Sequence, residues 1–103
     1  MSKLHNDVAD AFRHNIPFKN PYAEVVHRDD KLFLITRDGP IMCKQNETVY
    51  ILVKRLSEAR MKYINAILRY YNSRVTTNRN WCHLITNPGC NIAVPPTWEV
   101  SYE

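Results

Sequence analysis

Glycine is scarce in this chain of 103 residues, because only Gly39 and Gly89 occur. Gly-rich phosphate loops, collagen-like repeats and flexible linkers all need more glycine, so this scarcity excludes them. Long apolar runs are missing too: the longest, Val49–Val53, is far below the roughly 20 residues that cross a bilayer. The first residues carry no apolar signal core. We therefore expect a cytoplasmic protein that does not bind membranes.

Cysteine is present but lacks the patterns of disulfide or metal proteins. The three cysteines, Cys43, Cys82 and Cys90, are an odd number without CxxC spacing, which predicts free thiols in a reducing compartment. Structural zinc sites usually pair their ligands at two- to four-residue spacing, and the group of Cys82, His83 and Cys90 has no such pair. We expect neither a metal nor another cofactor.

Catalytic signatures are also lacking. The chain has no GxSxG, HExxH or Walker motif and no paired carboxylates. The segment His27–Asp30 has the letters of a kinase catalytic loop, but the other kinase motifs are missing, so it predicts a charged hairpin turn. Neighbouring strand residues point to opposite faces, so Cys82 and His83 cannot pair as nucleophile and base. A thiol enzyme at Cys82 would need a base brought by the fold; we expect no enzyme.

The composition that remains is that of one ordinary globular domain, residues 1–103. The apolar fraction is 45% and the charged fraction is 23%. The formal net charge of +4 and the isoelectric point near 9.1 favour an acidic partner, either a nucleic acid or an acidic protein surface.

The hydrophobic pattern predicts an α+β fold. An apolar stripe at helical spacing predicts a first helix over Lys3–His14. Strand-forming segments separated by turn signals follow and predict an antiparallel meander of three or four strands, at Tyr22–Arg28, Lys31–Arg37, Ile41–Lys44 and Thr48–Lys54. We expect a small antiparallel sheet of 3–5 strands, with the N-terminal helix and one main helix packed on it.

Two of these strands have an unusual pattern. Lys31–Arg37 and Thr48–Lys54 are apolar on both alternating faces, which favours central strands that are covered on both sides. Residues 74–80 are polar and predict a loop, and Trp81–Thr86 predicts a further strand. Thr97–Tyr102 alternates as an edge strand with three residues facing inward, namely Trp98, Val100 and Tyr102.

The main helix is predicted over Ser57–Asn72, with Ser57 as the N-cap. Its polar residues share an arc of only about 80°, and its apolar arc is roughly twice what packing on one sheet face requires. This helix must therefore bury a second side against the N-terminal helix, the C-terminal segment or another molecule. A homodimer that uses this arc is one alternative.

Two sets of residues are candidates for binding. Tyrosine, tryptophan and arginine dominate protein interfaces, which predicts partner binding by Tyr63, Tyr70, Arg69, Arg74 and Trp81. Alternatively, six basic residues on one side would follow a phosphate backbone, with Trp81 or Tyr70 stacking on a base: Lys54, Arg55, Lys62, Arg69, Arg74 and Arg79.

The segment Leu32–Asn72, which covers about two-fifths of the chain, combines an apolar strand, a tight turn, a hairpin and a Ser-capped helix that ends in aromatics. In this arrangement it resembles small phage-encoded accessory proteins, including anti-defence proteins. The resemblance implies a virus-encoded modulator that inhibits a host defence or host enzyme by binding. We expect a non-enzymatic protein that binds another protein, either a host protein or its own second copy, or alternatively a small basic nucleic-acid-binding protein.

Overall fold

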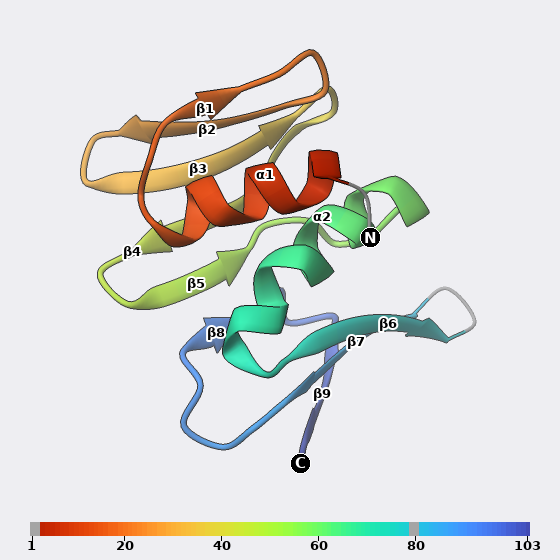
Figure 1. Cartoon of the computed structure of the whole chain (residues 1–103). Coiled ribbons are helices and arrows are strands. Elements are labelled where there is room, and N and C mark those ends of the chain that lie inside the picture. The colour runs from red at the N-terminus through yellow and green to blue at the C-terminus, as the bar shows by residue number, and fades with distance from the viewer. Residues whose placement is uncertain (1–2, 79–80) are drawn as a thin grey trace.

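The computed structural model describes residues 3–78 and 81–103, which form two α-helices, one 3-10 helix and nine strands in two sheets (Figure 1). The helices are α1 (Lys3–Arg13), α2 (Glu58–Leu68) and the 3-10 helix η1 (Arg69–Tyr71). The strands are β1 (Phe18–Lys19), β2 (Ala23–Arg28), β3 (Lys31–Thr36), β4 (Gly39–Gln45), β5 (Thr48–Ile51), β6 (Arg74–Asn78), β7 (Trp81–Thr86), β8 (Ile92–Ala93) and β9 (Glu99–Tyr102).

The large sheet has the strand order β1-β2-β3-β4-β5-β8. Strands β2 to β5 form the antiparallel meander that the turn signals predict. Gly39, with a φ of 106°, makes the tight turn between β3 and β4 at which glycine is favoured. The short strand β8 adds to β5 in parallel and joins a distant part of the chain to the meander.

The small sheet has the order β6-β7-β9, with β6 antiparallel and β9 parallel to β7. The predicted single sheet of 3–5 strands is therefore wrong, because the described chain has nine strands in two sheets. Residues 74–80 were predicted as a loop, but β6 occupies most of this segment. Its β-branched run from Val75 to Thr77 pairs with β7, although four of the five residues of β6 are polar, which is why its composition suggested a loop.

Strand β9 forms at the edge of the small sheet as predicted, but its burial differs from the prediction. Trp98 is buried and donates its Nε1–H to the carbonyl of Lys54 at 3.2 Å. Val100 and Tyr102, which were predicted to face inward, are 38% and 68% exposed. The reason is their position on an edge strand, beside which the described residues place no further strand to cover the side chains.

Helix α2 lies between α1 and the small sheet (Figure 1). The hydroxyl oxygen of Ser57 accepts the backbone N–H of Arg60 at 3.2 Å, which confirms the predicted N-cap. Because α1 covers one side of α2 and β6 covers another, most of its surplus apolar arc is buried within the chain itself. The centre of the core contains Phe12, Leu34 and Ile64.

Among residues 3–78 and 81–103, no helix is long and apolar enough to cross a membrane.

Candidate functional site

Neighbouring residues of β4 distinguish the two faces of the large sheet. Lys44 reaches α1, where its Nζ donates to the carbonyl oxygens of Phe12 at 2.7 Å and Arg13 at 3.3 Å. Side chains alternate along a strand, so Cys43 points to the opposite face, away from α1. We call the face with Lys44 the inner face and the face with Cys43 the outer face.

An apolar row crosses the outer face. The strand register places one apolar residue of each of five consecutive strands side by side, in the order Val26, Phe33, Cys43, Tyr50 and Ala93. Strands lie about 4.8 Å apart, so the row is roughly 19 Å long. These residues are separate from the hydrophobic core, which gathers around the inner face and the helices. In the part of the chain that the structure describes, both helices lie on the inner side (Figure 1).

The centre of this row is well packed, and its other members are more exposed. Cys43 is only 5% exposed, because Phe33 and Tyr50 flank it on the adjacent strands. This burial raises the pKa of the Cys43 thiol, although the nearby charge of Lys31 opposes the shift. Tyr50 is 38% exposed, and the side chains of Val26 and Phe33 are half-buried.

Polar residues border the row at the ends of the strands. Arg28 pairs with Lys31, and Gln45 pairs with Thr48, on the same outer face. Leu52, the residue after β5, extends the apolar surface beyond the end of that strand and is 44% exposed. An apolar centre with a polar rim is the usual anatomy of a protein interface.

Sequence reasoning noticed the pattern behind this face but did not identify it as a site. The segments Lys31–Arg37 and Thr48–Lys54 were expected to be covered on both sides, and the described chain covers only the inner one. The signal was therefore present in the two-sided apolar pattern. The register that aligns Phe33, Cys43 and Tyr50 could not be obtained from it, because it depends on the bulge between Leu34 and Ile35.

Of the residues predicted to bind a partner, three lie near α1. Tyr63 is buried, with its ring edge-on to His5 at a centroid distance of 4.6 Å, and burial raises its pKa. Tyr70 donates a hydrogen bond to the carboxylate of Asp10, which is the main reason that its pKa is raised. Arg69 is exposed beside the same helix, where it lines a cavity of about 300 Å³ with Tyr70 and Asp10.

Arg74 and Trp81 lie on the small sheet, away from Tyr63. They belong to opposite ends of the β6–β7 ladder, since Arg74 pairs with Ile85 and Trp81 pairs with Asn78. Trp81 is 61% exposed. Arg74 lies 3.5 Å from Glu103 in an exposed ion pair, a kind that contributes little to stability. The structure thus distributes the five predicted residues over two regions rather than one surface.

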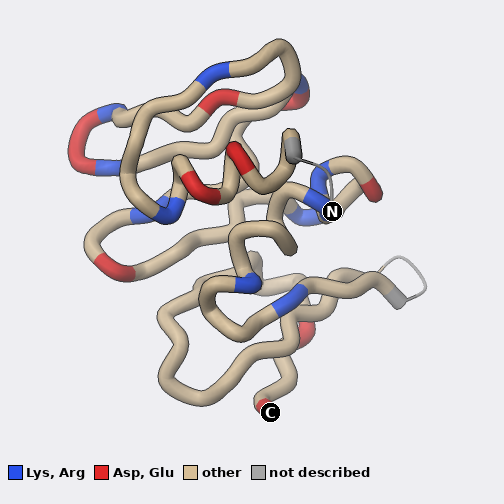
Figure 2. Tube along the Cα trace, viewed as in Figure 1, with Lys and Arg blue, Asp and Glu red and all other residues tan. Residues whose placement is uncertain are grey.

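The basic residues of the nucleic-acid alternative are also spread out. Lys54 and Arg55 precede α2, Lys62 lies on α2, and Arg69 and Arg74 flank the turn after it. Arg79 lies outside the described residues. Figure 2 shows acidic segments interleaved with basic ones, so this view has no face that is basic alone.

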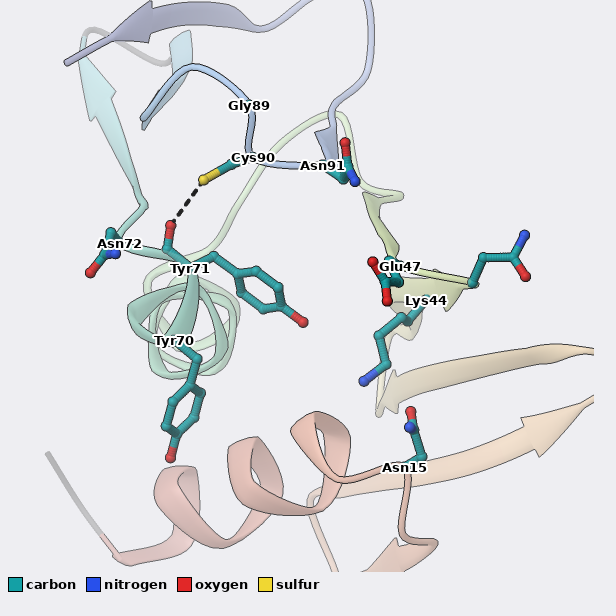
Figure 3. A pocket seen from close by; sticks show the side chains of 10 residues that line it. Asn15, Lys44, Glu47, Tyr70, Tyr71, Asn72, Gly89, Cys90 and Asn91 are labelled. Atoms are coloured by element: carbon teal, nitrogen blue, oxygen red, sulfur yellow. Dashed lines mark hydrogen bonds between the residues drawn. The ribbon is translucent and has the colours of Figure 1, made fainter.

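A cavity of about 550 Å³ lies between α1, η1 and the Gly89–Asn91 loop. Figure 3 shows Lys44 and Tyr71 reaching into it, while Tyr70 points away towards α1. Two of its polar groups have partners in the chain: Lys44 binds carbonyl oxygens of α1, and the Cys90 thiol donates to the carbonyl of Tyr71 at 3.3 Å. Burial lowers the pKa of Lys44. The hydrogen bonds of Lys44 at this cavity join the C-terminal end of α1 to the sheet.

The remaining candidates for chemistry are separated by the fold. Cys82 is buried, where its thiol is 3.7 Å from the carbonyl oxygen of Lys54. His83 points to the opposite face of β7 and shares a 2.6 Å hydrogen bond with Ser101. That pair lies on an open sheet face in contact with solvent, which does not favour nucleophilic catalysis. In the described ranges, no group of three His, Cys, Asp or Glu residues could hold a metal ion.

A comparison with protein-family models finds no match to this chain, and comparisons with curated proteins and with solved structures also find none.

Proposed function

We propose that this protein is a non-enzymatic binding protein that modulates or inhibits a partner protein by covering part of its surface through the outer face of the large sheet. The observation that carries the proposal is the apolar row from Val26 to Ala93 on the face opposite the helices. Apolar sheet faces are normally covered by a second layer, and a partner surface with an apolar centre supplies that layer here.

The resemblance of Leu32–Asn72 to phage-encoded accessory proteins agrees with this mode of action. It covers β3, β4 and β5, which provide the middle of the row, namely Phe33, Cys43 and Tyr50. A protein that occupies a host enzyme's surface needs no catalytic residues of its own. We therefore extend the proposal to a virus-encoded inhibitor of a host defence or host enzyme.

Lysine substitution at Tyr50 tests the proposal. Tyr50 is partly exposed, so Tyr50→Lys places a charge at the row without forcing it into the core. The matched control is Tyr22→Lys, which changes a more exposed tyrosine on the helix side, in a cavity that also contains His5 and Tyr63. Proteins captured from the native cells by the wild type are identified, and their affinities for each variant are measured.

Tyr50→Lys should weaken partner binding by about tenfold or more, as expected for an aromatic residue at an interface centre, while Tyr22→Lys leaves it unchanged. Equal affinity of Tyr50→Lys and the wild type would contradict the placement. Light scattering at micromolar concentration shows whether the partner is a second copy, because a dimer of the wild type that Tyr50→Lys dissociates would identify it as one.

A second candidate, binding of single-stranded nucleic acid, has one observation in its favour. Trp81 and His83 occupy alternate positions of β7, so both rings lie on the open face of the small sheet, with Arg74 on the neighbouring strand. Successive bases stack on such rings. Glu99 and Glu103 on the same face oppose phosphate binding.

Fluorescence anisotropy with labelled single-stranded DNA and RNA tests this second candidate at low salt, where phosphate attraction is strongest. If the second candidate is correct, the protein binds these oligonucleotides, the affinity falls as the salt concentration rises, and Trp81→Ala lowers the affinity. No binding at low salt eliminates it.

A further inference from the structure

The two sheets have four edge strands, and their protection differs. In the large sheet, β1 and β8 are only two residues long, and short edges offer little for another strand to pair with. In the small sheet, the side chain of Asn65 covers the edge of β6 at Val75: its Nδ2 donates to the carbonyl of Val75 at 3.2 Å, and its Oδ1 accepts the N–H of Val75 at 2.8 Å. The fourth edge is β9, whose four residues are all exposed.

The parallel pairing of β9 determines which of its backbone groups are free. Glu103 donates its N–H to the carbonyl of Thr86 at 2.8 Å, and Tyr102 is the register partner of Thr86. In a strand, residues that bond to one neighbour alternate with residues whose N–H and C=O point the other way. Ser101 therefore faces β7 like Glu103, and the backbone groups of Val100 and Tyr102 point away from the sheet.

The side chains of β9 are arranged in the same alternating order. Val100 and Tyr102 share a face with the buried residue Leu84, and both are substantially exposed. Glu99 and Glu103 lie on the other face with Ser101. Among the described residues, Glu103 pairs with Arg74, and no ion pair is formed by Glu99. An added strand would meet apolar groups on one face and carboxylates on the other.

The acidic residues of this edge disfavour pairing with a second copy. In the antiparallel register centred on Ser101, Val100 faces Tyr102 of the second copy. This register gives a partner to the outward N–H and C=O of both Val100 and Tyr102 in each copy. The same register places Glu99 directly opposite Glu103 of the second copy, and it does so twice. Like charges opposite each other destabilise a strand pair.

We propose that β9 is a strand-addition site for an extended segment of a partner protein that runs antiparallel to it and alternates apolar residues with lysine or arginine. The backbone of this segment pairs with Val100 and Tyr102, its apolar side chains cover theirs, and its basic side chains lie opposite Glu99 and Glu103. This edge belongs to the small sheet and is distinct from the outer face of the large one.

A peptide with the core Lys-Val-Thr-Val-Lys, which reads the same in both directions, tests the proposal by NMR titration of the isotope-labelled protein. Binding should shift the amide signals of Val100 and Tyr102. A peptide with both valine nitrogens methylated keeps its side chains and charges but loses the N–H donors that face β9, so its binding should be lost. Equal binding of the two peptides, shifts confined to other strands, or no binding of the parent peptide overturns the proposal.

Charge reversal separates strand pairing from nonspecific attraction. The peptide Glu-Val-Thr-Val-Glu should bind the wild type about tenfold more weakly, because two attractive pairs become repulsive. In Glu99→Lys, the difference in affinity between the basic and the acidic peptide should become smaller or change sign. An unchanged preference in Glu99→Lys would overturn the proposed pairing of the basic residue with Glu99.

Discussion

The side-chain amide of Asn65 on α2 pairs with both backbone groups of Val75 on β6, donating at 3.2 Å and accepting at 2.8 Å. It thereby occupies the position of a neighbouring strand at the outer edge of β6. The same contact joins α2 to the small sheet, so one polar side chain both caps the edge of β6 at Val75 and holds two elements together. Asn65 is one of the residues in the narrow polar arc of this helix, and its residue type alone does not indicate this contact.

Loss of this contact should reduce stability. Asn65→Ala leaves the N–H and C=O of the buried Val75 without partners, and we expect the free energy of unfolding to fall by about 2–3 kcal/mol. Asn65→Asp keeps the acceptor for the N–H but turns a carboxylate oxygen towards the Val75 carbonyl oxygen, so it should also reduce stability. Urea unfolding gives both values, and hydrogen exchange at the Val75 amide should accelerate in Asn65→Ala. Unchanged stability in Asn65→Ala would contradict this role.

His5 should make stability depend on pH. Burial, together with the charge of Lys62, holds its pKa below the ordinary value of 6.5. The unfolded chain therefore binds this proton before the folded chain does as pH falls. The contribution of His5 to the free energy of unfolding is full above about pH 6.5 and is lost as the pH drops through the pKa of the folded protein.

Urea unfolding at a series of pH values measures this effect. His5→Phe keeps an aromatic ring beside Tyr63 but does not titrate, so the loss of stability between about pH 7 and pH 5 should be smaller than in the wild type. The prediction fails if the two proteins lose stability equally over this range.

The reactivity of Cys43 tests the packing of the outer face. In a chain that carries Cys82→Ala and Cys90→Ala, the remaining thiol is buried and its pKa is raised, so it should react slowly with a thiol reagent at neutral pH. Tyr50→Ala removes one of its two aromatic neighbours and should increase the rate severalfold. Tyr22→Ala, on the helix side, should leave the rate unchanged. A rate that does not respond to Tyr50→Ala would contradict the register of the row.

Much of the meander could be predicted because its signals are local. The turn at Asp29-Asp30 and the turn at Asp38-Gly39-Pro40 separate strands whose bounds agree with the structure within a few residues. The N-cap at Ser57 is equally local, since its hydroxyl binds a backbone group three residues away. These features depend on neighbours in the sequence, which is why residue types alone identified them.

The small sheet could not be predicted in the same way. Strand β6 has only one apolar residue, Val75, and its pairing with β7 and the support from Asn65 are tertiary contacts that composition does not reveal. The position of β9 also depends on a parallel pairing across a long connection. In the sequence, the apolar row was apparent only as two strands that are apolar on both faces. Its alignment depends on the register of five strands, which the sequence does not show.

Site-specific photo-crosslinking tests the central claim most directly. The photoreactive amino acid p-benzoylphenylalanine is placed in the protein at position 50, or at position 22 as the control, in the cells that naturally contain the protein. We predict one specific crosslinked partner from the position of Tyr50, on the outer face, and none from that of Tyr22. The same partner crosslinked equally from both positions, or a crosslink from position 22 alone, would contradict the proposal that the outer face of the large sheet is the binding surface.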